Sequence, residues 1–284
     1  MLIQRLLAAL VLIPIVIAGL FFLSISNFAI VMLVIFALSS WEWAQFLHFT
    51  TKRSKSIFTI LLTTLAAIIY YLPSYVYLPI NIFEIILLSS IAWWSVALVL
   101  VLSYPKSVKL WGTSFFNKLL FAFFTLMPFF IAMIQLRQIN YGLNSYEGAY
   151  WLLYILVLVW ATDSGAYFAG RLWGKHKLAP SVSPGKTIEG LMGGVVSSII
   201  IGLLVYYSHF FNAPFYPFMI SSVVAIFASV LGDLTESMFK REANIKDSGH
   251  LIPGHGGILD RIDSLTAAMP IFAAFILYIF GANM

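Results

Sequence analysis

The sequence predicts an all-α polytopic integral membrane protein with about nine transmembrane helices. Three observations lead to this fold class. Of the 284 residues, 61% are hydrophobic and only 10% are charged, whereas a soluble domain carries roughly 25% charged residues. Long apolar segments recur along the chain, each near the roughly 20 residues that a helix needs to cross a bilayer. The basic residues, finally, are distributed unevenly between the segments that join these spans.

Nine apolar segments are expected to be helices, because lipid offers no hydrogen-bond partners to an open backbone. The first follows Arg5 and resembles the apolar part of a signal peptide, but no convincing small-residue cleavage site follows, so we interpret it as an uncleaved helix. Continuous hydrophobicity argues against a membrane barrel, whose strands alternate apolar and polar residues. The expected spans are residues 6–23, 28–46, 57–72, 80–102, 117–136, 149–166, 190–208, 215–236 and 258–281.

The positions of the basic residues set the expected orientation. With nine spans, 15 of the 16 Lys and Arg residues fall on one side of the membrane and only Arg137 falls on the other. Because cytoplasmic loops are enriched in Lys and Arg, we expect a cytoplasmic N-terminus and an outside C-terminus. The net charge of +5 is small and reports orientation, so no nucleic-acid partner is expected. The absence of cysteine excludes disulfides and a thiolate metal site.

Charged and glycine-rich segments concentrate in the second half of the chain. We therefore divide it into N-terminal transmembrane helices, residues 1–150, serving as a scaffold for dimer or lipid contacts, and a C-terminal catalytic region, residues 151–284. The catalytic region includes two predicted cytoplasmic loops, 167–189 and 237–257. In the first half, Glu42 is expected either at the interface or paired inside the bundle.

Three carboxylates form the predicted metal site. Asp260 and Asp263 are three residues apart where the last span begins, which places them on one helix face. Asp233 lies near the cytoplasmic end of the preceding span, and the connecting loop can return the chain to the same edge. Carboxylate oxygens are ligands that Mg²⁺ prefers. The alternative is that these interfacial residues are merely solvated or cap helices.

Basic residues and glycines surround these acids. Arg binds phosphate through two donors and Lys as a point charge, although a basic loop can also be only a topology signal. The glycine-rich turn at 253–257 suits an anion at a helix N-terminus, or it is a plain turn. His250 and His255 do not indicate zinc, since no Cys and no HExxH spacing accompany them. The basic residues are Lys240, Arg241, Lys246 and Arg261.

A second polar cluster lies between the sixth and seventh spans. Asp163 ends one apolar segment, and residues 183–190, Ser-Pro-Gly-Lys-Thr-Ile-Glu-Gly, precede the next. The segment lacks the GxxxxGK[ST] pattern after a strand, so a Walker A loop is rejected. It still provides Ser, Lys and Thr at a turn before a helix, which suits nucleotide phosphates. A short basic cytoplasmic loop is the alternative interpretation.

These segments together resemble the signature of the phosphatidate cytidylyltransferase (CDP-diacylglycerol synthase) family. The similarity is specific over about 27 residues and extends over much of 160–264, whereas residues 1–150 are similar only in hydropathy. One departure is Gly185, where the family commonly has Lys, which weakens phosphate contact there. The matching residues are Ser237, Lys240, Arg241, Lys246, Asp247, Pro253, His255, Gly256, Gly257, Asp260, Arg261 and Asp263.

The resemblance implies a nucleotidyltransferase of the cell (inner) membrane, commonly dimeric, with its active site facing the cytoplasm. It would use CTP, phosphatidate and Mg²⁺, as one or two ions, to make CDP-diacylglycerol and pyrophosphate in phospholipid biosynthesis. Asp233, Asp260 and Asp263 would bind metal, and the four basic residues above would complete the catalytic set. The implied substrate-binding residues are Asp163, Ser183, Lys186, Thr187, Glu189, Ser237, Asp247, His255, Gly256 and Gly257.

Two other functions fit the sequence less well. A CDP-alcohol phosphatidyltransferase also uses Asp clusters, but it typically carries four Asp residues in one contiguous motif, which is not found in this sequence. A transporter would place its charges near mid-membrane at discontinuous helices, whereas these charges lie at one edge.

Overall fold

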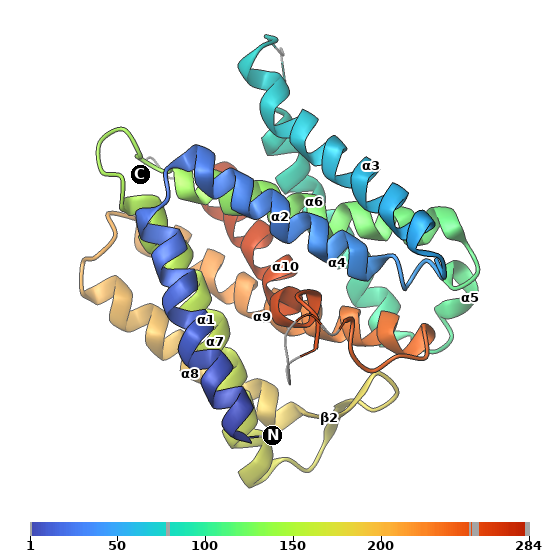
Figure 1. The fold of residues 1–284 in the computed structure, drawn as a ribbon. Helices are drawn as coiled ribbons and strands as arrows, with labels where there is room; N and C mark the ends of the chain where they lie inside the picture. Colours follow the sequence, from blue (N-terminus) through green and yellow to red (C-terminus); the bar gives the residue numbers. More distant parts are fainter. Residues whose placement is uncertain (1, 78–79, 250, 252–255, 282–284) are drawn as a thin grey trace.

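The computed structural model describes residues 2–77, 80–249, 251 and 256–281, and within them a bundle of long helices (Figure 1). Eight of these helices are long and apolar enough to cross a bilayer, and α1 is a ninth long helix, of 21 residues. The predicted all-α, multi-span fold class is therefore confirmed, whereas a ninth span formed by α1 stays a prediction. The helices are α1 (Leu2–Phe22), α2 (Ile25–Trp43), α3 (Lys52–Tyr71), η1 (Leu72–Ser74), α4 (Ile82–Leu102), α5 (Val108–Trp111), α6 (Phe115–Gln138), α7 (Glu147–Trp173), α8 (Ile188–Tyr207), α9 (Phe215–Glu242), α10 (Leu259–Ala273) and η2 (Ala274–Ile279).

Five of the long helices begin at a Ser, Thr or Asn whose side chain accepts a hydrogen bond from the first turn. These are the residue types that best satisfy the free N–H groups of a helix start. Each such cap directly precedes the first turn of its helix, so a local feature of the sequence marks where the helix starts. The capping residues are Ser24, Thr51, Asn81, Ser114 and Thr187.

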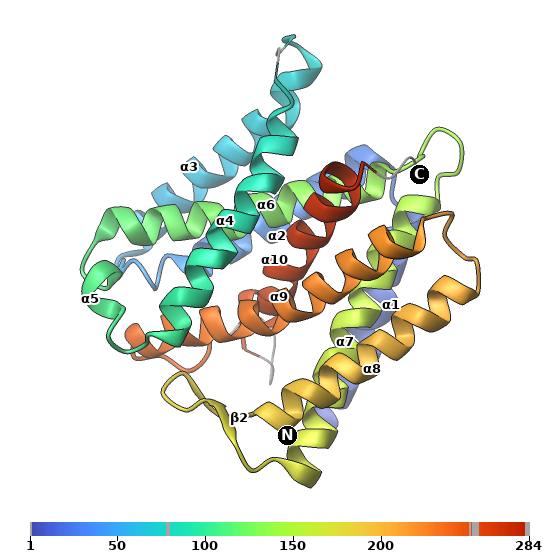
Figure 2. The same cartoon turned by 180° about the vertical axis from the view of Figure 1, so that it is seen from behind.

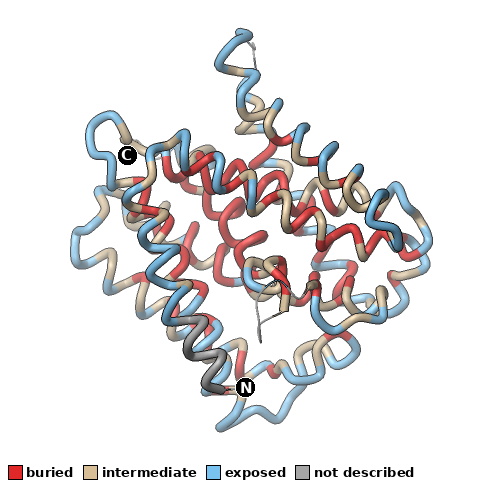
Figure 3. The backbone as a smooth tube through the Cα atoms, in the orientation of Figure 1, coloured by how far each residue is buried: buried red, intermediate tan, exposed pale blue. Residues whose placement is uncertain are grey.

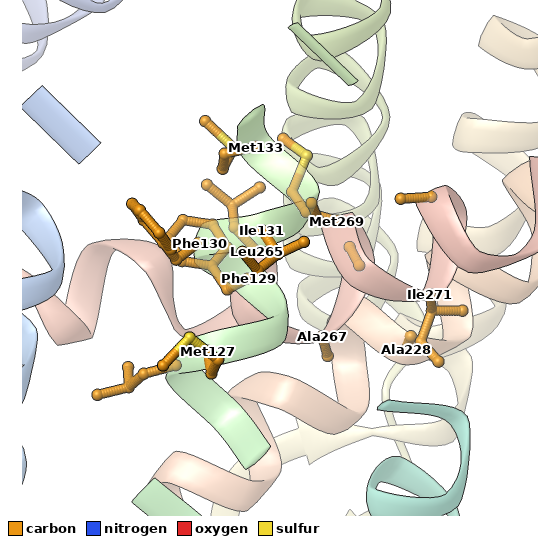
Figure 4. Close-up of a cluster of buried hydrophobic side chains, with 14 of the residues drawn as sticks. Met127, Phe129, Phe130, Ile131, Met133, Ala228, Leu265, Ala267, Met269 and Ile271 are labelled. Carbon is orange, nitrogen blue, oxygen red and sulfur yellow. The ribbon is translucent and has the colours of Figure 1, made fainter. Parts of the chain in front are cut away.

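The centre of the bundle is formed by α6, α9 and α10, where buried residues concentrate (Figure 3). Phe130 and Met127 of α6 are fully buried, as are Met269 and Ala267 of α10. Figure 4 shows these side chains in one buried cluster around α6 and α10, with Ala228 of α9 beside Ile271. The ring of Phe130 packs edge-on against Phe36 of α2 and Tyr70 of α3. The charged loop between α9 and α10 is therefore attached at both ends to helices of this core.

The helices α7 and α8 pack along each other through small residues, and α1 lies beside α7 (Figures 1 and 2). A Cβ atom added at Gly193 would overlap Ala169, and one at Gly194 would come 2.6 Å from the carbonyl oxygen of Thr162. Such close backbone approach is typical of membrane helices, which gain little from hydrophobic burial and pack through small residues instead.

A β-hairpin joins α7 to α8 at the end of the bundle where α1 begins (Figure 2). Its strands β1 (Lys177–Ala179) and β2 (Ser183–Thr187) are antiparallel, with Lys177 opposite Thr187. The helices on either side of the predicted loops are longer than expected: α7 continues to Trp173 and α9 to Glu242. The two predicted loops, 167–189 and 237–257, thus begin with helical turns, because a helix satisfies its own backbone hydrogen bonds beyond the apolar layer.

Candidate active site

Lys240 lies in a buried charged cluster on the last turns of α9. Its Nζ atom is 2.8 Å from Oδ1 of Asp260 and 3.4 Å from Oε2 of Glu236, and only 12% of its side chain is exposed. Removing one partner from a buried pair of this kind leaves an uncompensated charge and costs several kcal/mol. Lys240 is therefore fixed in place between α9 and α10.

Asp260 uses both of its carboxylate oxygens within the protein. Oδ1 accepts from Lys240, and Oδ2 accepts from the backbone N–H groups of Ser248 and Gly257, both at 2.8 Å. Gly256 precedes this contact with φ of +79°, and a Cβ there would come 2.6 Å from Oδ2. Asp260 thus holds the loop between α9 and α10 against the start of α10, and glycine is required where it does so.

Glu42 of α2 reaches the same loop from the other half of the chain. It is 1% exposed and accepts from the Ser248 hydroxyl at 3.1 Å and from the N–H groups of Ile258 and Leu259 at 3.0 and 2.8 Å. Gln45 adds a hydrogen bond to the Ser248 carbonyl at 2.6 Å. A carboxylate at a helix N-terminus is stabilised by the free N–H groups and the helix dipole.

The sequence interpretation missed this anchoring role of Glu42. It allowed that the residue is paired inside the bundle, which is where the structure places it, but its partners are backbone amides and a hydroxyl. The only available signal was a carboxylate inside an apolar segment, which is costly and needs a specific partner.

A polar pocket of about 490 Å³ lies between α7, α8, α9 and the hairpin, at the hairpin end of the bundle. Asp163, Arg171, Lys186 and Asp233 all line it. Lys186 Nζ is 2.6 Å from Asp233 Oδ2, and the two side chains remain 27% and 29% exposed. Ser237, one turn after Asp233, donates to its other oxygen at 3.3 Å. The pocket thus presents charges of both signs to solvent, as a site for an anion with a cation requires.

Asp263 lies where α9 and α10 approach most closely. A Cβ at Gly232 would come 2.5 Å from the Asp263 carbonyl oxygen, so the backbone of Asp233, the next residue, is also close to Asp263. The Asp263 Oδ1 atom accepts from the Ser264 N–H at 2.7 Å. Glu236 lines the same small cavity as Asp263, and its two buried carboxylate oxygens accept no hydrogen bond.

The described side chains fit Mg²⁺ in type but do not form a closed protein cage. Among the described residues, no three Asp, Glu or His side chains lie close enough together to hold an ion by themselves. Mg²⁺ is commonly bound through one or two carboxylates, with waters and substrate phosphates completing the shell. Asp233, which lines the pocket, suits an ion of that kind. So does Glu236, whose buried oxygens accept no hydrogen bond although Lys240 Nζ lies 3.4 Å from Oε2. The three-ligand set remains a prediction.

Two of the predicted substrate-binding residues also shape the hairpin. Thr187 lines the pocket and accepts from the Gly190 N–H at 3.1 Å, which starts α8. Glu189 accepts from the backbone N–H groups of Lys175 and His176 at 3.1 and 3.2 Å and contacts the His176 ring at 2.6 Å. These bonds hold the turn after α7, so the structure accounts for Glu189 without a ligand.

The remaining predicted residues are mostly on the surface. Arg241 donates from Nε to the carbonyl of Val182 at 3.1 Å, which ties α9 to the hairpin. Ser183 begins β2. His255 lies outside the described residues. Three further residues are exposed on or beside the loop between α9 and α10: Lys246, Asp247 and Arg261.

The fold defines a multi-pass membrane protein, and the site places charged side chains of both signs in a pocket at one end of its helix bundle. A model described as the Cytidylyltransferase family matches residues 3–279. The chain belongs to this family and is a nucleotidyltransferase.

Named relatives cover almost all of the chain. It is 44% identical to a phosphatidate cytidylyltransferase of Haemophilus influenzae, over 98% of this chain and 100% of the relative. A Pseudomonas aeruginosa protein of the same name is 40% identical over 96% of each chain. A Bacillus subtilis protein with that name is 40% identical over 65% of this chain and 67% of its own. These matches favour a cytidylyltransferase over the phosphatidyltransferase and transporter alternatives.

Proposed function

We propose that this protein is a phosphatidate cytidylyltransferase, which makes CDP-diacylglycerol and pyrophosphate from CTP and phosphatidate in phospholipid biosynthesis. The observation that carries the proposal is the 44% identity, over 98% of the chain, with a relative of that name. The polar pocket lined by Lys186, Arg171 and Asp233 supports it, because both substrates carry phosphate groups.

The proposed reaction is a nucleotidyl transfer. A phosphatidate phosphate oxygen attacks the α-phosphorus of CTP, a new P–O bond forms, and the bond to the β-phosphate oxygen breaks to release pyrophosphate. No general base is needed, since a phosphate monoester is largely ionised near neutral pH. Both reactants are anions, so catalysis depends on holding them together and neutralising their charge.

The pocket residues supply that neutralisation. Lys186 pairs with Asp233, and we assign its ammonium group to phosphate when a cation binds Asp233. Arg171 lines the same pocket and is within reach of the same anions. Asp233 and Asp263 would hold Mg²⁺, and Asp260, the third predicted ligand, would join them only by exchanging its bonds to Lys240 and to the loop. Bound there, Mg²⁺ would neutralise the triphosphate and the leaving pyrophosphate.

The activity is tested with the full-length protein in lipid nanodiscs, supplied with CTP labelled at the α-phosphate, dioleoyl phosphatidate and Mg²⁺. We expect lipid-soluble label and pyrophosphate in equal amounts. Omission of phosphatidate is the control and should abolish both. In a parallel assay with CDP-diacylglycerol and an acceptor alcohol, transfer of the phosphatidyl group to the alcohol with release of CMP, and no turnover of CTP in the first assay, would instead identify a phosphatidyltransferase and overturn the proposal.

We also propose that the pocket faces the cytoplasm from the cell (inner) membrane and that the protein is a homodimer. The chain has no cysteine, so single-cysteine variants report sidedness without background. Lys177→Cys in the hairpin should react with a membrane-impermeant maleimide only in inside-out vesicles, and Asn144→Cys, between α6 and α7, only in right-side-out vesicles. The reverse pattern would contradict the orientation, and a monomeric mass in nanodiscs would contradict the dimer.

A further inference from the structure

A second cavity, of about 550 Å³, is lined mainly by residues of α4, α9 and the hairpin, elements that can be followed in Figure 2. Its floor includes the buried side chains of Trp94, Ala228 and Ile271. Its rim is apolar and exposed although it lies on membrane-spanning helices, so in a bilayer it would border hydrocarbon. The exposed rim residues are Leu98, Leu102 and Phe227, at 45%, 75% and 48%.

This apolar groove adjoins the polar pocket of the candidate active site. Leu178, Leu191 and Val230 line both cavities, so the two adjoin at these aliphatic side chains. The hairpin covers both, because residues 178–182 line the groove and 185–187 line the pocket. The hydrogen bond from Arg241 to the carbonyl of Val182 holds the hairpin in that position.

We propose that the groove binds one acyl chain of the phosphatidate whose phosphate occupies the polar pocket. The inference rests on the proposed function and assigns its lipid subsite. A ligand that fills both cavities must join an anionic group to a hydrocarbon chain, which describes an anionic lipid and neither nucleotide nor free phosphate. The glycerol backbone of that lipid crosses at Leu178, Leu191 and Val230.

The end of the groove nearest the hairpin suits the ester groups of such a lipid. Tyr104 and Ser181 bring hydroxyl groups to an otherwise apolar lining. Partial burial, and then the negative charge of Glu242, raise the pKa of Tyr104 above its usual value. Its phenol therefore stays protonated at neutral pH and can donate to an ester carbonyl.

The groove is expected to position the lipid more than to attract it. A chain that leaves the bilayer for an apolar groove exchanges one hydrocarbon environment for another, so the hydrophobic gain is small. Fixing the chain instead holds the phosphate at one depth and orientation, which is a catalytic contribution. Blocking the groove should thus lower kcat/KM for long-chain phosphatidate.

The test compares Ser95→Trp with Val96→Trp. Ser95 lines the groove and is exposed, so the larger side chain fills the groove without entering the core, whereas Val96 is equally exposed and lies outside the lining. For Ser95→Trp we expect kcat/KM to fall about tenfold with dioleoyl phosphatidate, and by less than about twofold with dihexanoyl phosphatidate. Val96→Trp should match the wild type with both lipids, and the KM for CTP should not change in either variant.

A second measurement does not depend on turnover. Phosphatidate carrying a diazirine on one acyl chain should label peptides of α4 and α9 around the groove, and excess unlabelled phosphatidate should prevent it. Labelling that phosphatidate does not reduce, or an unchanged chain-length profile in Ser95→Trp, would overturn the inference. If the wild type makes no CDP-lipid from either phosphatidate, the proposed function fails, and competed labelling still decides the groove separately.

Discussion

Two charged clusters in this molecule use the same residue types in opposite ways. The anchoring cluster, defined as Glu42, Lys240, Ser248 and Asp260, is buried, and each carboxylate oxygen in it accepts from a protein donor. The pocket cluster, defined as Asp163, Lys186 and Asp233, lines an open cavity of about 490 Å³ and contains one ion pair, which is partly exposed.

The difference separates residues that hold the site from residues that are free to bind substrate. A carboxylate whose oxygens are all bonded within the protein must break those bonds to bind anything else, at a cost of about 1–3 kcal/mol for each group left unsatisfied. A single ion pair with partial solvent contact contributes only about 0–1 kcal/mol. Lys186 and Asp233 can thus exchange partners cheaply, whereas Asp260 and Lys240 cannot.

The largest effect is expected for Asp233→Asn in the pocket cluster. Loss of the charge should lower kcat by about 10²–10³, as removal of a group that stabilises developing charge does, while the melting temperature stays near that of the wild type. Steady-state kinetics measure the loss of kcat, and thermal unfolding in detergent measures the melting temperature. Asp263→Asn and removal of Mg²⁺ by EDTA should give similar losses of activity.

Glu147→Gln, at the far end of α7, is the control for Asp233→Asn, because its carboxylate bonds Asn140 and is not among the pocket-lining residues. Full activity of Asp233→Asn at ordinary Mg²⁺ would remove this residue from the predicted metal site.

A smaller effect, mainly on stability, is expected for Glu42→Ala in the anchoring cluster. The change leaves two backbone N–H groups and the Ser248 hydroxyl without their acceptor. A loss of about 2 kcal/mol in the free energy of unfolding corresponds to a melting temperature lower by about 5 °C. Activity should fall with it, because the loop and the start of α10 lose their support.

Glu84→Ala is matched to Glu42→Ala, since Glu84 is also a carboxylate at the end of a span but lies in the first turn of α4. Its melting temperature should change little. An unaltered melting temperature in Glu42→Ala would contradict the stabilising role assigned to the anchoring cluster.

Lys186→Ala should raise the KM for CTP or for phosphatidate about tenfold with a lesser change in kcat, since the variant loses one charge-assisted contact to phosphate. Lys175→Ala is the comparison, because this exposed lysine follows α7 but is not among the residues that line the pocket. Unchanged KM values for both substrates would show that Lys186 has no binding role.

The smallest predicted effect is an increase in substrate affinity on substitution of Gly185. Gly185 lines the pocket, and a Cβ added there would meet nothing within 4 Å. Gly185→Lys therefore fits without strain and adds a positive charge where the resembling family commonly has Lys. We expect the KM for one phosphate-bearing substrate to fall about two- to fivefold, as an exposed ion pair allows; Gly185→Ala should leave it unchanged. A higher KM in Gly185→Lys would contradict the proposed phosphate position.

The helices could be predicted from the sequence because each depends on a local property, an apolar run of sufficient length, and five of them also begin at a capping residue. The hairpin could not, since β1 has only three residues and β2 contains Pro184 and Gly185, which have low strand propensity. The extension of α7 to Trp173 was missed for a related reason. Polar residues mark the edge of the membrane but do not end a helix.

The candidate site was predicted less completely, because its details depend on contacts between distant residues. Asp260 and Asp263 lie on one face by spacing, yet Asp260 bonds Lys240 and the loop while Asp263 lies against Gly232. The bond between Glu42 and Ser248 spans 206 positions of the chain. No local pattern specifies such a partner.

That long-range bond has a consequence for building hybrid proteins. The carboxylate that supports the start of α10 belongs to α2, so the two halves of the chain are not interchangeable parts. A chimera that joins residues 151–284 to the N-terminal helices of another membrane protein would insert and span correctly, yet its last helix would start without an acceptor for two amides. The chimera would be stable only if the protein that supplies the N-terminal helices has an acidic side chain at the position equivalent to Glu42.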